Sequence, residues 1–185
     1  MAQLTWNPGQ EGRVVLDDYY RRAFGPAADQ VRRYFEILEQ ARMEYVGKNG
    51  YAAGAINLGA LFHSGLLDTA EAHLRQAAKA AAKDREVYRQ RVEFVRAGFA
   101  FTRLVAENSR LMSGYWDNTD ETAAARVQEN WERMESLCQA HPLAINWRAV
   151  RPGTPRMAGL HPDHPNPKLR KQKPNRKPPN DLDLK

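Results

Sequence analysis

The stretch from Asp84 to Met112, DREVYRQRVEFVRAGFAFTRLVAENSRLM, decides the fold class of this chain. Its apolar and small side chains recur at steps of three and four residues, in two sets that together cover more than one face of a helix. These sets are Tyr88, Val92, Val95, Phe99, Thr102 and Ala106, and then Phe94, Gly98, Phe101 and Val105. A helix that is apolar on several faces is buried. We therefore expect a long central helix over 84–112, with Asp84 as its N-cap.

Upstream of this stretch the helical periodicity continues. A short helix is expected over roughly 14–24, a second helix has Pro26 as its first residue, and a third starts at Asp68, with Glu71 completing a capping box. The expected buried faces are Ala27, Val31, Tyr34, Leu38, Ala41 and Tyr45 in the second helix, and Ala70, Leu74, Ala77 and Ala81 in the third. The residues between them, 47–66, contain five glycines. A loop of that length is usually functional or disordered.

Downstream, a further helix follows Thr119 or Asp120 and ends at His141-Pro142. Its inward positions are expected to be Ala124, Val127, Trp131, Met134 and Cys138. No alternating apolar and polar segment of useful length is present, so strands are not expected. The sequence thus predicts an all-α bundle of about five helices.

Composition divides the chain into three regions. Its 185 residues are 42% hydrophobic, which is enough for one domain with a core. The formal charge of +6 comes from residues 151–185, which hold 9 Lys and Arg against 3 Asp and contain 8 of the 11 prolines. We expect a linker over 1–13, a helical bundle domain over 14–150, and a disordered basic Pro-rich tail over 151–185, because the tail has little to bury.

Several function classes find no support in the sequence. Cys138 is the single cysteine, so the chain can form no internal disulfide and no Cys-based zinc site. No apolar run approaches the ~18 residues of a membrane span, and we expect no membrane partner. No cofactor motif, metal-ligand spacing or catalytic constellation is present. The location would be cytoplasmic if Met1 is the true start, and secreted or periplasmic if the chain is a fragment of a longer parent.

Candidate substrate-binding residues are Tyr115, Trp116, Asp117 and Asn118, expected in the loop between the last two long helices. An exposed aromatic ring beside amides and a carboxylate can stack on a sugar and bind its hydroxyl groups. The alternative is that the tryptophan plugs the end of the core. Asp17 and Asp18 form an adjacent carboxyl pair, but neighbouring helical residues point about 100° apart. We interpret both as early-helix carboxylates favoured by the helix dipole, and we assign no catalytic residue.

The remaining polar candidates have simple interpretations. His63, His73 and His141 are isolated in sequence and suit surface or capping positions. His161 and His164 can hold a metal only adventitiously. The tail cations Lys168, Arg170, Lys171, Lys173, Arg176 and Lys177 can displace counterions from phosphates. They lack interleaved aromatic residues for base stacking, so we expect a solvating tail and not a nucleic-acid binder.

One resemblance points to a function. The run from Trp6-Asn7-Pro8 through Asp17-Asp18-Tyr19-Tyr20 to Phe24-Gly25-Pro26-Ala27 resembles a bacterial helical domain of unknown function. That domain lies C-terminal to the TIM barrel in glycoside-hydrolase-like proteins related to α-glucuronidases and β-hexosaminidases. The paired segments Leu74-Arg75-Gln76-Ala77 and Arg91-Val92-Glu93-Phe94-Val95 resemble the same family, and coverage is roughly residues 3–140. In that family a segment like Trp6-Asn7-Pro8 comes where the chain leaves the barrel.

The resemblance implies a non-catalytic accessory module. It would pack against a TIM-barrel domain, in cis in a parent protein or in trans, and meet carbohydrate only through that partner. The barrel itself is missing, so the family's catalytic carboxylates correspond to no residue here. The alternative is a small helical adaptor whose basic tail binds an acidic partner or nucleic acid.

Overall fold

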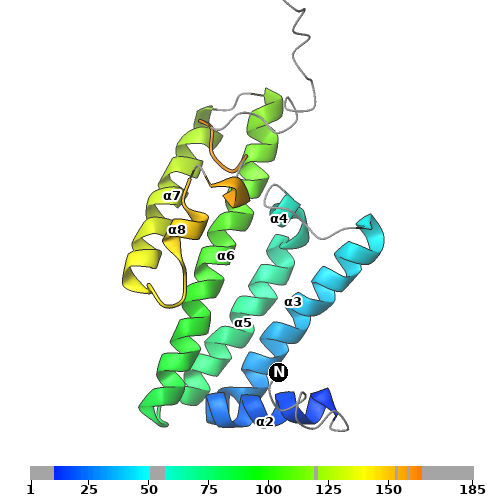
Figure 1. Cartoon of the computed structure of the whole chain (residues 1–185), viewed down its shortest axis with the longest axis vertical. Helices are drawn as coiled ribbons and strands as arrows, with labels where there is room; N and C mark the ends of the chain where they lie inside the picture. Colours follow the sequence, from blue (N-terminus) through cyan, green and yellow to red (C-terminus); the bar gives the residue numbers. More distant parts are fainter. Residues whose placement is uncertain (1–10, 51–56, 119–120, 153, 158, 164–185) are drawn as a thin grey trace, which may run out of the picture.

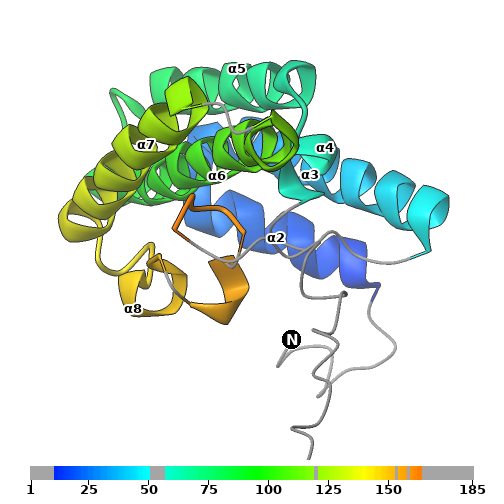
Figure 2. The same ribbon diagram turned by 90° about the horizontal axis from the view of Figure 1, so that it is seen from above.

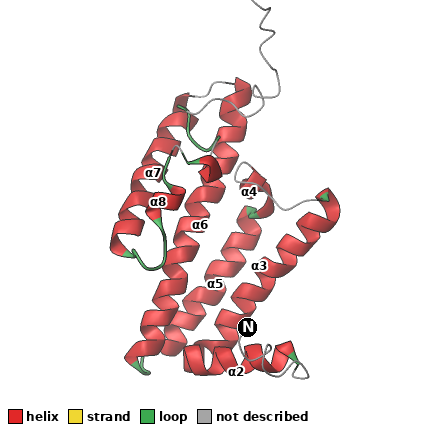
Figure 3. Cartoon of the chain, in the orientation of Figure 1, coloured by secondary structure: helices red, strands yellow, loops and turns green. Residues whose placement is uncertain are grey.

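A computed structural model describes residues 11–50, 57–118, 121–152, 154–157 and 159–163, apart from the side chains of residues 116–118 and 155. Over these ranges the chain forms helices and turns and no strand (Figure 3). The long helices are α2 (Gly12–Phe24), α3 (Ala28–Asn49), α5 (Ser64–Ala81), α6 (Glu86–Asn118) and α7 (Glu121–Ala140). The predicted all-α bundle of about five helices is confirmed.

Four of these helices pack in sequence, α3 on α5, α5 on α6 and α6 on α7 (Figure 1). Helix α2 crosses one end of the bundle, where it contacts α3 and α6 (Figures 1 and 2). Helix α6 also contacts the short helix α4 (Leu58–Leu61). Because α6 touches α2, α4, α5 and α7, it is the central helix that its several apolar faces predict.

The predicted buried faces are largely confirmed. The four expected positions of α5 are all buried, and Leu67 joins them. In α7 the buried side chains include Val127, Trp131, Met134 and Cys138, while Ala123 and not Ala124 is the fully buried alanine. In α3 the stripe is buried only as far as Tyr34, and the later positions are half-buried. The far end of α3 diverges from α5, which leaves those positions only partly covered (Figure 1).

The junction between α2 and α3 differs from the prediction. Gly25–Ala27 forms a short 3-10 helix, η1, so α3 begins at Ala28 and not at Pro26. Gly25 has φ of +52°, and a Cβ there would lie 2.4 Å from Cε2 of Tyr88 on α6. The chain turns this sharply because the junction packs directly on the Tyr88 ring, and only glycine fits that turn.

Helix α5 starts earlier than Asp68. His63 is its N-cap, and the His63 Nδ1 accepts a hydrogen bond from the Leu66 N–H at 3.2 Å. Asp68 and Glu71 therefore form no capping box. Both carboxylates instead pair with the Arg103 guanidinium of α6, at 3.1 and 2.5 Å. A charged partner on the neighbouring helix holds these two side chains, and an imidazole provides the cap that a carboxylate was expected to provide.

Helix α6 is also shifted at both ends. It begins at Glu86, and Asp84 lies in the preceding turn, where its carboxylate accepts from the N–H of Arg85 at 2.6 Å. It ends at Asn118, beyond the expected end at Met112. Met112 is fully buried and Tyr115 packs against the same cluster as Trp131 of α7. Packing against α7 thus sustains the additional turns.

The segment 47–66 is shorter as a loop than predicted. Helix α3 continues to Asn49, and α4 occupies Leu58–Leu61. Residues 51–56, between these two helices, lie outside the described residues. Gly59 of α4 packs so closely on α6 that a Cβ would lie 2.7 Å from Cγ of Arg110. At least one glycine of this segment therefore serves helix packing.

Residues that directly follow the predicted boundary at residue 150 pack on the helical bundle. Met157 and Leu160 are buried with Met112, Val127 and Trp131, and the Trp131 Nε1–H donates to the Leu160 carbonyl at 3.0 Å. The short helices α8 (Trp147–Val150) and η3 (Pro155–Met157) lead into this contact. The two apolar side chains supply the burial that the average composition of the tail lacks. Residues 1–10 and 164–185 lie outside the described residues. Helix α2 begins at Gly12, so the last two residues of the linker predicted over 1–13 are helical.

Candidate functional site

The predicted sugar-binding residues do not form a loop. Tyr115, Trp116, Asp117 and Asn118 belong to the last turn of α6. Tyr115 is half-buried and packs against the core cluster that contains Met112 and Trp131. The side chains of residues 116–118 lie outside the described part of the chain. Tyr115 thus contributes to the core, and both interpretations of Trp116, as a sugar-binding residue or as a plug of the core, stay predictions.

The adjacent carboxylates of α2 are both held in ion pairs. Asp17 accepts from Arg32 of α3 at 3.0 Å, and Asp18 pairs with Arg22 at 2.8 Å. The hydrogen bond with Asp17 raises the pKa of the Arg32 guanidinium. The two carboxylates thus bind different cations, Asp17 that of Arg32 and Asp18 that of Arg22.

Three of the histidines have hydrogen-bonding partners and the cysteine is buried, while His164 lies outside the described residues. His63 caps α5, and the His73 Nδ1 lies 2.9 Å from Oε1 of Gln30. The ring of His161 lies 3.0 Å from the Gln128 side-chain oxygen. Cys138 is buried, as predicted, and burial, with Glu135 as the lesser cause, raises the pKa of its thiol. Within the described ranges no cluster of three or more His, Cys, Asp or Glu residues is placed to hold a metal ion.

Several charged side chains of α6 bind groups on neighbouring helices. Arg103 pairs with Asp68 and Glu71 of α5, and Glu107 binds Arg126 of α7 at 3.0 Å. Arg110 donates to the Phe62 carbonyl, just beyond α4, at 3.0 Å. These groups connect α6 to three neighbouring helices. The basic cluster from Lys168 to Lys177 lies outside the described residues.

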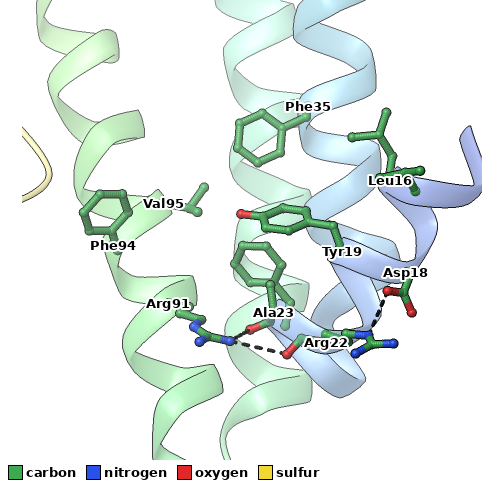
Figure 4. A pocket seen from close by; sticks show the side chains of 11 residues that line it. Leu16, Asp18, Tyr19, Arg22, Ala23, Phe35, Arg91, Phe94 and Val95 are labelled. Carbon is green, nitrogen blue, oxygen red and sulfur yellow. Dashed lines mark hydrogen bonds and ion pairs between the residues drawn. The ribbon is translucent and has the colours of Figure 1, made fainter. Parts of the chain in front are cut away.

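Sequence reasoning missed an apolar groove on the surface of the described bundle. A groove of about 1040 Å³ lies between α2, α3 and α6 (Figure 4). Its apolar lining includes Leu16 and Tyr19 of α2, Phe35 of α3, and Phe94 and Val95 of α6. We call it the α2–α6 groove. It comes from segments that are far apart in the sequence and meet only because α2 crosses the end of the bundle.

The large side chains of this groove are half open to solvent. Tyr19 is 56% exposed, Leu16 54%, Phe94 51% and Phe35 41%. Single exposed apolar residues are ordinary, but a cluster of large ones usually marks an interaction site. Fully burying one such side chain stabilises a complex by roughly 1.5–3 kcal/mol.

Polar groups gather at one end of the groove, and they already have partners (Figure 4). The Asp18 carboxylate pairs with Arg22 at 2.8 Å. The Arg91 guanidinium donates to the carbonyls of Ala23 and Arg22 at 3.0 and 3.3 Å, at the C-terminal end of α2. Cations favour that end of a helix because of the helix dipole. No described polar group of the lining is arranged as a nucleophile or a general base.

One signal for the groove was available in the sequence. The apolar positions of 84–112 cover more than one stripe, and Phe94 belongs to the second stripe while the adjacent Val95 belongs to the first. A helix with two apolar stripes needs two neighbours. In the structure Val95 packs against core clusters, and Phe94 is left exposed.

The rest of the molecule adds little to this description. No described helix is both long enough and apolar enough to cross a membrane. Comparisons with protein-family models, with curated proteins and with solved structures find no match to this chain.

Proposed function

We propose that this chain is a non-catalytic helical accessory module of a carbohydrate-active, glycoside-hydrolase-like protein. It packs against a TIM-barrel domain through the α2–α6 groove. The observation that carries the proposal is the cluster of large exposed apolar side chains on α2, α3 and α6. A partner that covers them removes apolar surface from water.

The position of α2 supports the choice of partner. In the family that the sequence resembles, the segment like Trp6-Asn7-Pro8 follows the barrel. Helix α2 begins at Gly12, four residues after Pro8, and it provides Leu16 and Tyr19 to the groove. A chain that leaves a barrel at Trp6 would bring this side of the module close to the barrel surface.

The chemistry of the groove supports packing over catalysis. Its lining is mostly apolar, and its charged groups pair with one another or with main-chain carbonyls. A catalytic site instead needs groups that are held ready for a reacting atom. We therefore expect the chain alone to hydrolyse no glycoside.

The proposal is tested by complex formation in trans. The probe is the TIM-barrel part of a bacterial glycoside-hydrolase-like protein of the resembled family, cut after the barrel. We expect co-elution in size-exclusion chromatography with light scattering, at a one-to-one mass. The substitution Phe94→Asp should abolish the complex, because it places a charge in the apolar contact.

The matched control is Met43→Asp. Met43 is 64% exposed, lies on α3 and does not line the groove. This variant should bind as the unchanged chain does. Absence of binding by the unchanged chain, or equal binding by the Phe94→Asp variant, contradicts the proposal.

A further inference from the structure

We infer that the α2–α6 groove takes one amphipathic α-helix of the partner, with acidic side chains beside its apolar stripe at the end of the groove that holds Arg22 and Arg91. The inference rests on the proposed function, because this helix would belong to the outer surface of the partner domain. It adds the secondary structure and the charge of the surface that is bound.

The walls of the groove favour a helix. Leu16 and Tyr19 rise on one side from α2, Phe94 and Val95 form the other side on α6, and Phe35 lies between them (Figure 4). Side chains spaced three and four residues apart on a partner helix form ridges that fit such a groove. A peptide that binds by adding a strand needs a free strand edge, and the described residues contain no strand.

The polar groups argue against a small polar molecule as the occupant. Small-ligand sites combine an apolar lining with a few polar groups that converge on the ligand. Here Arg91 is directed to the main-chain carbonyls of Ala23 and Arg22, and Arg22 is directed to Asp18. These charged groups lie together at one end and do not converge within the groove, and the rest of the lining is apolar surface that suits leucine-like side chains of a protein partner.

The charge at the end of the groove selects acidic partners. Asp18 is the one carboxylate of the lining, and it is shared between Arg22 at 2.8 Å and Arg21 at 3.6 Å. The side chain of Arg22 is 81% exposed and that of Arg21 is 73% exposed, whereas that of Asp18 is only 32% exposed. Arg91 adds a further exposed cation. With Arg22 and Arg91 against the single carboxylate of Asp18, the charged lining of the groove is net positive even without Arg21, which lies outside it, and Glu or Asp beside the partner's apolar stripe complements it.

The test is selection from a phage-displayed library of random peptides long enough for four helical turns, with the full chain as bait. We expect enriched peptides that carry apolar residues at i, i+3, i+4 and i+7 and Asp or Glu beside them. Synthetic copies should gain helical circular dichroism on binding. Replacing their acids by Lys should weaken binding by about tenfold or more.

Variants of the chain test whether the peptide binds in the α2–α6 groove. Phe94→Asp should abolish peptide binding and Met43→Asp should not. Arg22→Glu should reverse the preference, so that the Lys peptide binds more tightly than the acidic one. Arg33→Glu is the charge control, because Arg33 is exposed on α3 outside the groove. Thermal unfolding of each variant shows that it is folded.

Three outcomes overturn the inference. The first is enrichment of peptides without acids or without the helical spacing. The second is a dimer of the chain in sedimentation that Phe94→Asp dissociates, because a second copy is then the occupant. The third is an increase of peptide affinity in Trp6→Ala, because the chain's own N-terminal segment then competes for the groove.

This test is independent of the barrel experiment. Selection of acidic helices without barrel binding would support the groove inference and contradict the proposed function. Barrel binding that Phe94→Asp weakens, together with selected peptides that lack acids, would support the proposed function and contradict the inference.

Discussion

At the scale of single residues, the junction between α2 and α3 shows how one position constrains a fold. Gly25 combines a positive φ with a Cβ position only 2.4 Å from the Tyr88 ring. Any other side chain meets both a strained backbone and a neighbour that must move. The Phe24-Gly25-Pro26-Ala27 turn therefore has a physical reason, besides its resemblance to a family.

The first prediction is that Gly25→Ala lowers the free energy of unfolding by roughly 1–3 kcal/mol, the cost of a strained backbone position. Urea denaturation measures it. Gly114 of α6 is the control, because it lies inside a helix and a Cβ there meets nothing within 4 Å. Gly114→Ala should raise stability by roughly 0.5–1 kcal/mol. A neutral Gly25→Ala would contradict the described junction.

Tyr34 gives a prediction for alkaline pH. Burial raises its pKa from 10.0 to about 12. Its contribution to stability is complete below pH 10.0 and is lost as the pH rises towards about 12, because only the unfolded chain ionises freely in that range. Urea midpoints measured across this range should fall for the unchanged chain and fall less for Tyr34→Phe. Parallel curves for the two proteins would show that Tyr34 is not buried.

At the scale of elements, starts and ends of helices were the least predictable features. The rule for capping boxes favours Asp68, yet α5 starts at Ser64 because His63 caps it. Arg103 of α6 forms ion pairs with Asp68 and Glu71 of α5. The local sequence around Asp68 cannot predict this contact between helices. The buried faces of the helices were easier to predict, because the periodicity of apolar residues indicates directly which side of a helix is buried.

The cap of α5 is tested by amide hydrogen exchange. In His63→Ala the Leu66 amide loses its acceptor and should exchange faster, with stability lowered by roughly 0.5–2 kcal/mol. In Asp68→Ala the exchange of Leu66 should stay unchanged. The opposite pattern would restore the capping box that the sequence predicts.

The segment after α8 gives a prediction with a larger effect. Leu160 is fully buried beside Met157 and Trp131. Leu160→Ala should cost roughly 2–5 kcal/mol, the usual range for a buried leucine. Leu143→Ala is the control, because Leu143 is 91% exposed and its replacement should change stability by less than about 0.5 kcal/mol. Equal, small effects in thermal or urea unfolding would contradict the packing of Leu160 on the bundle.

At the scale of the whole molecule, the sequence predicts the fold class and the central position of α6, because both follow from apolar periodicity. It does not predict the α2–α6 groove. That surface depends on how α2 crosses the bundle, which is set by the Gly25 turn and by the packing of Phe24 and Tyr88 in one cluster. The position of Phe94 outside the core follows from the same arrangement and cannot be read from its own helix.

The central claim is that the α2–α6 groove is the face on which a barrel domain packs. Hydrogen exchange of the full chain, measured with and without the barrel fragment, tests it most directly. The account predicts slower exchange in α2 and around Phe94 in the complex, and no change in α7. Protection confined to α7 and α8, or no protection anywhere, would contradict it.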